Sequence, residues 1–322
     1  MFLINNSCSD RIDISAKISE QNKRQQERAN PSYEWLQTAS ILSEELSHIK
    51  EFAGETFVIK CSEKAMNNPI LARQFAEDVV LLKQLGINPI VVHDGESQIS
   101  KKLEQLKMHS SFVNGLRVVD SATVEIVEMV LSGLINKQIV SEISAAGGMA
   151  IGISGKDSGL IEARKLRHSV GDSDSNIEQI IDLGFVGEPV SINPTLLQEL
   201  AESNIMPIIA PIAFGKNGET FSLNADMVAG CLAAAIAAKK LIIISDVIDG
   251  MNQENKKLSI SEARKLSRNK KVSSEIVSKL ETCLHALEND CEAAHILDGS
   301  LPHALLMAIF TKLGAGTMIY QD

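Results

Sequence analysis

The sequence has few aromatic residues, few prolines and no excess of positive charge. Aromatic side chains make up 4% of the 322 residues, prolines number eight, and hydrophobic residues reach 44%. This composition is typical of a globular protein with an aliphatic core. The formal net charge of −10 argues against a nucleic-acid partner, because a phosphate backbone needs a clustered basic face. The negative net charge does not exclude a nucleotide ligand, because such a ligand needs only a local pocket of lysines and backbone amides.

Cysteine is scarce, and no cysteine lies in a CxxC pair. The five cysteines are scattered along the chain at Cys8, Cys61, Cys231, Cys283 and Cys291. The seven histidines also lack the spacing of metal ligands. We therefore expect reduced thiols, with no disulfide framework and no resident metal site.

Long apolar runs are missing as well. The longest apolar run, Val228 to Ala238, has about half the length that a membrane-spanning helix requires. The first ten residues carry a three-residue apolar patch, too short for a secretory signal. These features predict a cytoplasmic protein without a membrane partner.

The chain is long enough for one large or two modest domains. Residues 1–30 are polar and mixed in charge, and we interpret them as a tail. Over residues 31–52 apolar residues recur at helical spacing, from Trp35 to Ile49, and predict an amphipathic helix that Gly54 stops.

Strands and helices alternate after Gly54. The predicted strands are Thr56–Lys60, Ile87–His93, Met149–Ser154, Leu160–Leu166, Ile205–Pro211, Leu241–Ser245, Ala294–Leu297 and Thr317–Tyr320. The predicted helices begin at Asn68-Pro69 and Asn193-Pro194 or cover Ile99–Leu106, Ala122–Ser144, Asn224–Ala238, Ser261–Ser267, Ile276–Leu287 and Pro302–Thr311. This alternation predicts an α/β fold, a mostly parallel sheet sandwiched by helices. Ligands of such sheets bind beyond the carboxyl ends of the strands.

Four residues near those ends are candidates for chemistry, each with a simpler explanation beside it. Lys60 ends the first strand of the alternating region, where it can meet a phosphate or simply face water. Asp226 opens a helix directly after Asn224, where an ordinary cap is the alternative. Lys279 lies on a helix flank, where solvated lysines are common. Arg117 can clamp a carboxylate with both arms of its guanidinium, or it is a turn residue.

The order of these residues within longer motifs is more specific. The chain contains FAGETFVIK (52–60), FAEDVVLLK (75–83), GINPIVVH (86–93), FVNGLRV (112–118), SGKD (154–157), DLGFVGE (182–188), PIIAP (207–211), NAD (224–226) and PHALL (302–306). From about Leu42 to Ile319 the chain resembles the acetylglutamate kinases of arginine biosynthesis, members of the amino acid kinase family.

The resemblance implies Mg-ATP as co-substrate and phosphorylation of the γ-carboxylate of N-acetyl-L-glutamate. It implies an acetylglutamate-binding and dimerisation lobe over residues 53–212 and a nucleotide-binding lobe over 213–322. Catalytic roles fall on Lys60, Lys279 and Asp226. Substrate binding falls on Gly95, Arg117, Ser222 and Asn224, and nucleotide binding on Lys60, Ser245, Asp246 and Lys279. The helix at 31–52 resembles the one that links dimers into hexamers in arginine-sensitive members, so we expect a homo-oligomer, a dimer or a hexamer.

The glycine-rich ligand loops of the family are altered here. Their positions hold Ser62 and Glu63, Asp94 and Glu96, and Ser274 and Glu275. Glycines let backbone N–H groups approach phosphate oxygens, and added Cβ atoms block that approach. A carboxylate roughly 4–5 Å from a phosphate also costs about 3–4 kcal/mol at an effective dielectric of about 20.

Two functions follow from this departure. The first is an acetylglutamate kinase whose catalysis is impaired by the acidic loops. The alternative is an inactive pseudokinase of the family that acts as a regulatory or oligomer-forming subunit. Ala308 replaces the acid that the resemblance implies for inhibitory arginine, although Gly314 remains, so we expect weak or absent arginine inhibition.

Overall fold

The computed structural model describes residues 40, 50–113, 116–171, 178–246, 256–269, 271–310 and 316–321. Residues Phe52–Asp322 form one compact unit, and residues before Phe52 form another. Nearly all of the predicted tail and of the helix at 31–52 lies outside the described residues.

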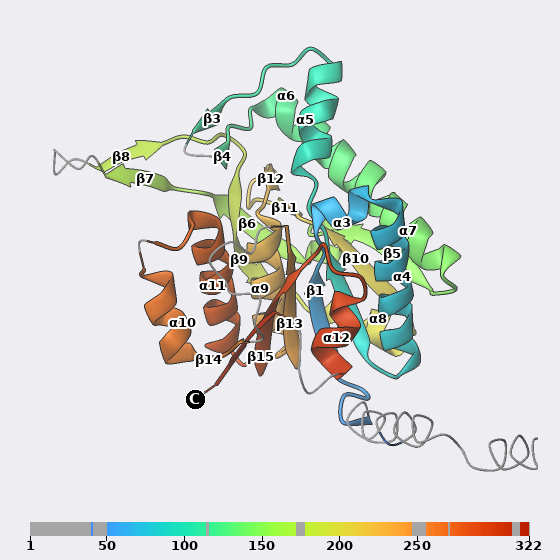
Figure 1. The fold of residues 1–322 in the computed structure, drawn as a ribbon. Helices are drawn as coiled ribbons and strands as arrows, with labels where there is room; N and C mark the ends of the chain where they lie inside the picture. The colour runs from blue at the N-terminus through green and yellow to red at the C-terminus, as the bar shows by residue number, and fades with distance from the viewer. Residues whose placement is uncertain are drawn as a thin grey trace, which may run out of the picture. The chain divides into compact units, whose positions relative to one another are not determined.

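A mixed sheet forms the centre of the unit that starts at Phe52 (Figure 1). Its strands within the described residues are, in spatial order, β14 (Lys256–Ser259), β16 (Thr317–Tyr320), β15 (Ala293–Asp298), β13 (Lys240–Ser245), β1 (Thr56–Lys60), β2 (Asn88–Val92), β10 (Met206–Ala210) and β5 (Ala150–Ser154). Neighbouring strands are parallel except β15 and β16, which are antiparallel. The predicted fold class is therefore confirmed.

Helices cover both faces of this sheet. The described helices are α3 (Glu63–Asn67), α4 (Pro69–Gln84), α5 (Glu96–Gln105), α6 (Ser121–Glu128), the π-helix η1 (Met129–Ile135), α7 (Asn136–Ala145), the 3₁₀ turn η2 (Asp157–Gly159), α8 (Thr195–Glu202), α9 (Ala225–Ala235), α10 (Ile260–Ser267), α11 (Ser274–Leu287) and α12 (Ala304–Phe310). Helices α8, α9 and α11 share one apolar core with the sheet, while α4, α7 and α12 contact its other face. Because both faces are covered, the central strands β10 and β13 are buried along their whole length, as their apolar sequence predicts.

Most strands outside the main sheet escaped prediction. A second sheet contains β12 (Thr220–Ser222), β11 (Ile212–Phe214), β6 (Ile161–Lys165) and β9 (Gly187–Ile192), and two hairpins pair β3 (Phe112–Val113) with β4 (Leu116–Arg117) and β7 (His168–Gly171) with β8 (Glu178–Ile181). Of these strands only β6 was expected. Apart from the six-residue β9, the missed strands have two to four residues, too few for an alternating pattern to stand out.

The predicted helix over Ala122–Ser144 is wrong as one continuous α-helix, because the π-helix η1 interrupts it. Leu131 and Ile135 of η1 pack against the backbone of Gly95, where an added Cβ would lie only 2.2 Å from Cδ1 of Ile135. Any other residue at position 95 would therefore require the side chains of Leu131 and Ile135 to shift.

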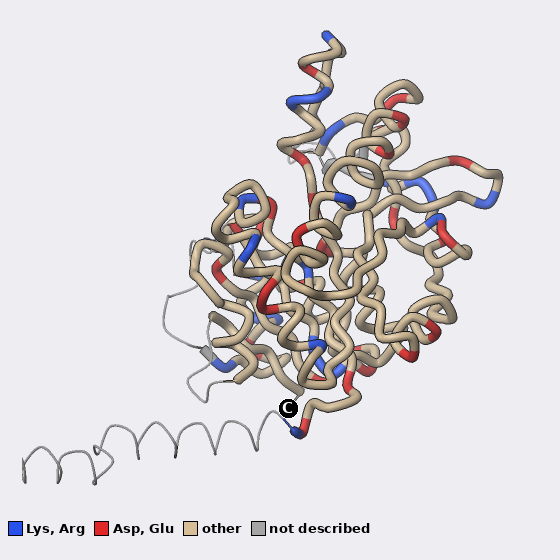
Figure 2. The backbone as a smooth tube through the Cα atoms, turned by 90° about the vertical axis from the view of Figure 1, so that its right-hand side faces the viewer, with Lys and Arg blue, Asp and Glu red and all other residues tan. Residues whose placement is uncertain are grey.

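The described surface carries both signs of charge. Figure 2 shows basic and acidic residues interspersed along the described backbone, in keeping with the acidic but mixed composition. Among the helices that the structure describes, none has the length and apolar character to cross a membrane.

Candidate active site

Parallel strands bring the predicted site residues to one edge of the sheet. Lys60, at the end of β1, pairs in register with Val92 of β2 and Ile243 of β13. The loops that follow β2 and β13 therefore begin beside Lys60, and they carry Asp94 and Asp246. Helix α9 contacts β1, β2 and β13, and Asp226 lies in its first turn.

Asp226 holds two lysines at once. Its Oδ2 lies 2.8 Å from Nζ of Lys279, and its Oδ1 lies 3.3 Å from Nζ of Lys60. All three residues are buried, with exposed fractions of 6% for Asp226, 5% for Lys60 and 4% for Lys279. The predicted catalytic trio thus comes together, and Lys279 is not the solvated lysine that its helix position would suggest.

Electrostatics keeps Lys60 and Asp226 charged. Burial alone would lower the pKa of Lys60, but the carboxylates of Asp226 and Asp94 outweigh burial and raise it. Burial would raise the pKa of Asp226, but Lys60 and Lys279 outweigh burial and hold it below its usual value. A buried pair of cations around a single carboxylate leaves positive charge to offer an anionic ligand.

The altered loops supply two further carboxylates to the same cluster. Oδ2 of Asp94 lies 3.5 Å from Nζ of Lys60, and Oε1 of Glu275 lies 3.5 Å from Nζ of Lys279. Both acidic side chains are nearly half exposed, at 41% and 48%. Each lysine of the trio therefore has a second, more exposed partner that a ligand must compete with.

Arg117 lies at the end of β4 and is also buried, with an exposed fraction of 7%. Its guanidinium donates to Glu96 and, at 2.7 Å, to the hydroxyl of Ser100, and it stacks on the ring of Phe112 at 4.7 Å. A buried guanidinium with hydroxyl and aromatic partners has the chemistry of a carboxylate clamp, and that role stays a prediction. The carboxylate that it holds here belongs to the chain itself.

The remaining altered loop residues form contacts between the loops. Ser62 caps α3 and donates its hydroxyl proton to Asp246. Oε1 of Glu63 accepts from the backbone N–H of Ser97 at 2.7 Å. Ser274 is the first residue of α11, and the neighbouring Ser273 provides the cap.

The other predicted ligand residues occupy the same edge. Ser245 is buried at the end of β13, directly before Asp246. Asn224 caps α9 by accepting from the N–H of Met227 at 3.0 Å, so the simple reading of a cap is confirmed. Ser222 pairs with Ile212 in the second sheet.

Sequence reasoning missed two buried polar residues that shape the loop at Asp94. The Nδ2 group of Asn136 lies 3.3 Å from Nε2 of His93 and donates to the carbonyl of Ile208 at 2.8 Å. Nδ1 of His93 lies 3.2 Å from the carbonyl of Asp94, and burial lowers the pKa of His93 to about 4. A neutral imidazole thus donates through Nδ1 and accepts through Nε2, which fixes the start of the loop. The signal was a polar residue inside an apolar helical pattern.

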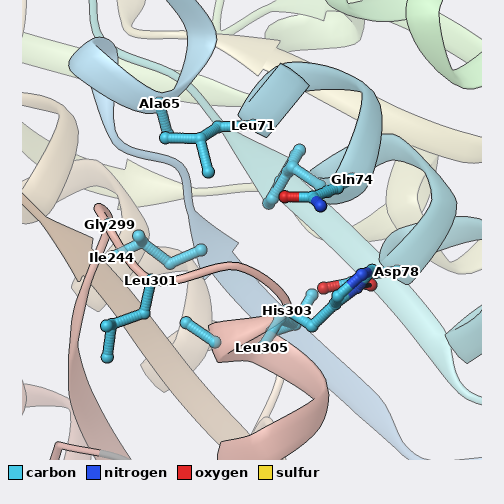
Figure 3. A pocket seen from close by; sticks show the side chains of 11 residues that line it. Ala65, Leu71, Gln74, Asp78, Ile244, Gly299, Leu301, His303 and Leu305 are labelled. Atoms are coloured by element: carbon cyan, nitrogen blue, oxygen red, sulfur yellow. Dashed lines mark hydrogen bonds and ion pairs between the residues drawn. The ribbon is translucent and has the colours of Figure 1, made fainter. Parts of the chain in front are cut away.

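A small cavity lies apart from this cluster, between α4 and α12 (Figure 3). Figure 3 shows Asp78 and His303 pointing toward one another across it, and His303 Nδ1 lies 2.6 Å from Asp78 Oδ1. Its volume of about 30 Å³ suits a water molecule rather than a substrate.

Comparisons with known proteins identify a family for the chain. The amino acid kinase family matches residues 55–298. The acetylglutamate kinase of Rhodospirillum rubrum is 52% identical over 288 residues, covering 88% of this chain and 93% of that protein. The acetylglutamate kinase of Ehrlichia canis is 46% identical over 322 residues, covering 98% of this chain and 97% of that protein.

Two solved structures share the fold. N-acetylglutamate synthase from Neisseria gonorrhoeae, complexed with coenzyme A and N-acetyl-glutamate, has a TM-score of 0.75 at 21% identity, covering 88% of this chain and 63% of that longer one. Carbamate kinase from Giardia lamblia bound to AMP-PNP has a TM-score of 0.58 at 14% identity, covering 84% of this chain and 99% of that one. At sequence identities this low, the likeness to these two structures shows a shared fold alone.

Proposed function

Because the chain belongs to the amino acid kinase family, with acetylglutamate kinases among its relatives, we propose that it phosphorylates the γ-carboxylate of N-acetyl-L-glutamate with Mg-ATP, a step of arginine biosynthesis. The observation that carries the proposal is the buried trio of Lys60, Lys279 and Asp226 at the carboxyl edge of the sheet. The predicted acetylglutamate kinase function agrees with the relatives, whereas nothing in the comparisons favours the inactive alternative.

The reaction needs charge neutralisation more than covalent help. A γ-carboxylate oxygen attacks the γ-phosphorus, the bond to the bridging oxygen of ADP breaks, and an acyl phosphate forms. Negative charge spreads over the phosphoryl oxygens in the transition state, and Lys60 and Lys279 stabilise it from two sides. Asp226 touches both lysines and acts as the orienting group.

In this proposal the part of the site around Arg117 recognises the acetylglutamate substrate. Arg117 holds the α-carboxylate of acetylglutamate, because a guanidinium fork matches a carboxylate bidentately. Gly95, Ser222 and Asn224 complete this half, in the lobe over 53–212 and at its border. Ser245 and Asp246 join the lysines on the nucleotide half, in the lobe over 213–322. The border between the two proposed lobes falls within β11.

We also propose a homo-oligomer. β5 is an edge strand of the main sheet, and its exposed Ile151 lies near the exposed Met149 in sequence. Met129 and Leu134 of η1 are exposed too, and η1 contacts β5. An apolar sheet edge of this kind is a pairing surface. Light scattering of the full chain distinguishes a dimer or hexamer from a monomer, and a monomeric mass would refute this proposal.

Calorimetric titration and turnover test the proposed function together. We expect Mg-ATP to bind in the micromolar to low-millimolar range and ADP to form only when N-acetylglutamate is present. Binding of both ligands without ADP formation would favour an inactive binding subunit. ADP formation with carbamate or free glutamate, but not with the acetylated substrate, would assign the chain to another activity of the family fold.

A further inference from the structure

The anion-binding groups of the site are already paired with carboxylates of the chain. Glu96 pairs with Arg117 and Asp94 with Lys60, while Glu63 accepts from the backbone N–H of Ser97. All three acids lie in the altered loops or directly after them. The pairs are the contacts that an anionic substrate would otherwise make.

Among these pairs, Glu96 and Arg117 differ most in the exposed fraction of their side chains. The side chain of Arg117 is 5% exposed, whereas that of Glu96 is 52% exposed. Glu96 bonds only to an NH2 group of the guanidinium through one oxygen, and NH1 donates to Ser110. The cation is therefore fixed in the protein, while its acidic partner reaches it from the solvent side.

One N–H donor of the Arg117 guanidinium has no acceptor among the described residues. Nε of Arg117 is buried and has no hydrogen-bond partner among the described residues. A bidentate carboxylate takes two N–H groups of the fork, and Glu96 takes one. A substrate carboxylate bound through Nε and NH2 would satisfy the buried donor and displace Glu96.

We infer that Glu96 is a specificity-determining residue that occupies the carboxylate clamp of Arg117 in the absence of substrate and competes with the α-carboxylate of acetylglutamate for it. This inference rests on the proposed function, because it uses acetylglutamate as the ligand of Arg117. It places the effect of Glu96 on substrate affinity rather than on phosphoryl transfer, since Glu96 pairs with Arg117 while Lys60, Lys279 and Asp226 are paired with one another.

Helix α5 makes displacement possible without unfolding the loop. Gly95 N donates to Asp94 at 2.7 Å, and Ser97 N donates to Glu63, so the first turn of α5 stays capped when Glu96 leaves Arg117. Burial raises the pKa of Glu96 although Arg117 opposes the rise, so the charged form gains little from its position.

The test compares Glu96→Gln with Glu104→Gln, which removes the same charge from an exposed position of the same helix. Calorimetry measures binding of N-acetylglutamate and of its α-carboxamide analogue, which lacks the group that Arg117 would hold. We expect Glu96→Gln to tighten acetylglutamate binding by about tenfold, because a charge-assisted contact no longer competes. Binding of the α-carboxamide should change by less than about twofold, and Glu104→Gln should leave both affinities unchanged.

The outcomes separate this inference from the proposed function. If Glu96→Gln binds acetylglutamate no better than the unmodified chain, or binds both analogues better by the same factor, the competition is refuted. Tighter binding with no turnover in any variant would leave the competition standing and refute the kinase. Glu96→Ala, which removes every acceptor, should tighten binding at least as much, and a weaker complex with both variants would show that Glu96 supports the site instead.

Discussion

Lys279 of α11 and Asp226 of α9 meet at 2.8 Å in the buried centre of the site, although 53 positions separate them in the sequence. The same carboxylate reaches Lys60 from its other oxygen. One acid thus sets the positions of two cations that arrive from a strand and a helix.

Replacing that acid should disable phosphoryl transfer. Asp226→Asn keeps the shape but removes the charge that orients both lysines, and we expect kcat to fall about a hundredfold. Asp290→Asn, at an exposed position with positive φ that asparagine tolerates, is the matched control. Steady-state kinetics measures kcat for both variants. An unchanged kcat in a folded Asp226→Asn variant would show that Asp226 has no role in phosphoryl transfer.

The arginine should act on substrate affinity. Arg117→Lys keeps the charge but loses the planar fork, so we expect the KM for acetylglutamate to rise about tenfold or more with kcat nearly retained. The KM for ATP serves as the internal control. An equal rise in both KM values would mean that the substitution disturbs the whole site.

The two acids beside the lysines should weaken nucleotide binding. Asp94→Asn and Glu275→Gln each remove a carboxylate 3.5 Å from a lysine, so the lysine gains freedom to pair with phosphate. Since both side chains are nearly half exposed, we expect an increase in Mg-ATP affinity of about three- to tenfold for each, less than the unscreened estimate. Glu281→Gln on the same helix as Glu275 is the control, and calorimetry makes the comparison.

Two buried histidines predict a loss of stability on acidification. Burial lowers the pKa of His93 to about 4 and that of His295 to about 3, so neither is protonated in the folded state near neutrality. As pH falls below the unfolded value of about 6.5, the unfolded chain takes up protons that the folded chain refuses. The free energy of unfolding should fall by about 1.4 kcal/mol per pH unit for each histidine between about pH 6 and pH 4.

Urea unfolding at several pH values measures this slope. His295→Leu removes one of the two histidines, whose Nε2 has no hydrogen-bond partner within the described part of the chain, and should flatten the slope by about half. A slope that His295→Leu leaves unchanged would mean that other groups cause the acid sensitivity.

Arginine should have little effect on this chain. Ala308 replaces the expected acid and is buried in the apolar helix α12, so it offers no partner to a guanidinium. We expect less than about a twofold change in rate and no thermal stabilisation at millimolar arginine. A clear loss of activity would require another acidic partner, and Gly314 lies outside the described residues.

The main sheet could be predicted because its strands are apolar on both faces, as in Leu241–Ile244, and because Asn68 and Asn224 mark helix starts by capping chemistry. The hairpins could not, because the two-residue strands β3 and β4 bury little apolar surface and carry no pattern. The π-helix η1 lies inside an otherwise regular helical pattern, and the sequence offered no Gly or Pro that would mark the interruption before Gly133.

The candidate site could likewise be predicted only in part from the sequence. The resemblance assigned Lys60, Asp226 and Lys279 to one site, and Asp226 does lie within ion-pair distance of both lysines, while their catalytic role stays a prediction. Periodicity gave no sign that Glu96 would turn to Arg117, or Glu275 to Lys279, because these pairs depend on side-chain geometry across loops. The acidic loops suggested repulsion of the ligand, and the structure adds that Asp94, Glu96 and Glu275 are each paired with one of the cations.

Hydroxylamine trapping of the acyl phosphate tests the central claim most directly. The full chain is incubated with Mg-ATP, N-acetylglutamate and hydroxylamine, and the hydroxamate that forms from an acyl phosphate is measured against an Asp226→Asn control. We predict hydroxamate and ADP in equal amounts for the unmodified chain and about a hundredfold less for Asp226→Asn. No hydroxamate above the Asp226→Asn level, from a folded protein that binds both ligands, would contradict the assignment of phosphoryl transfer to this site.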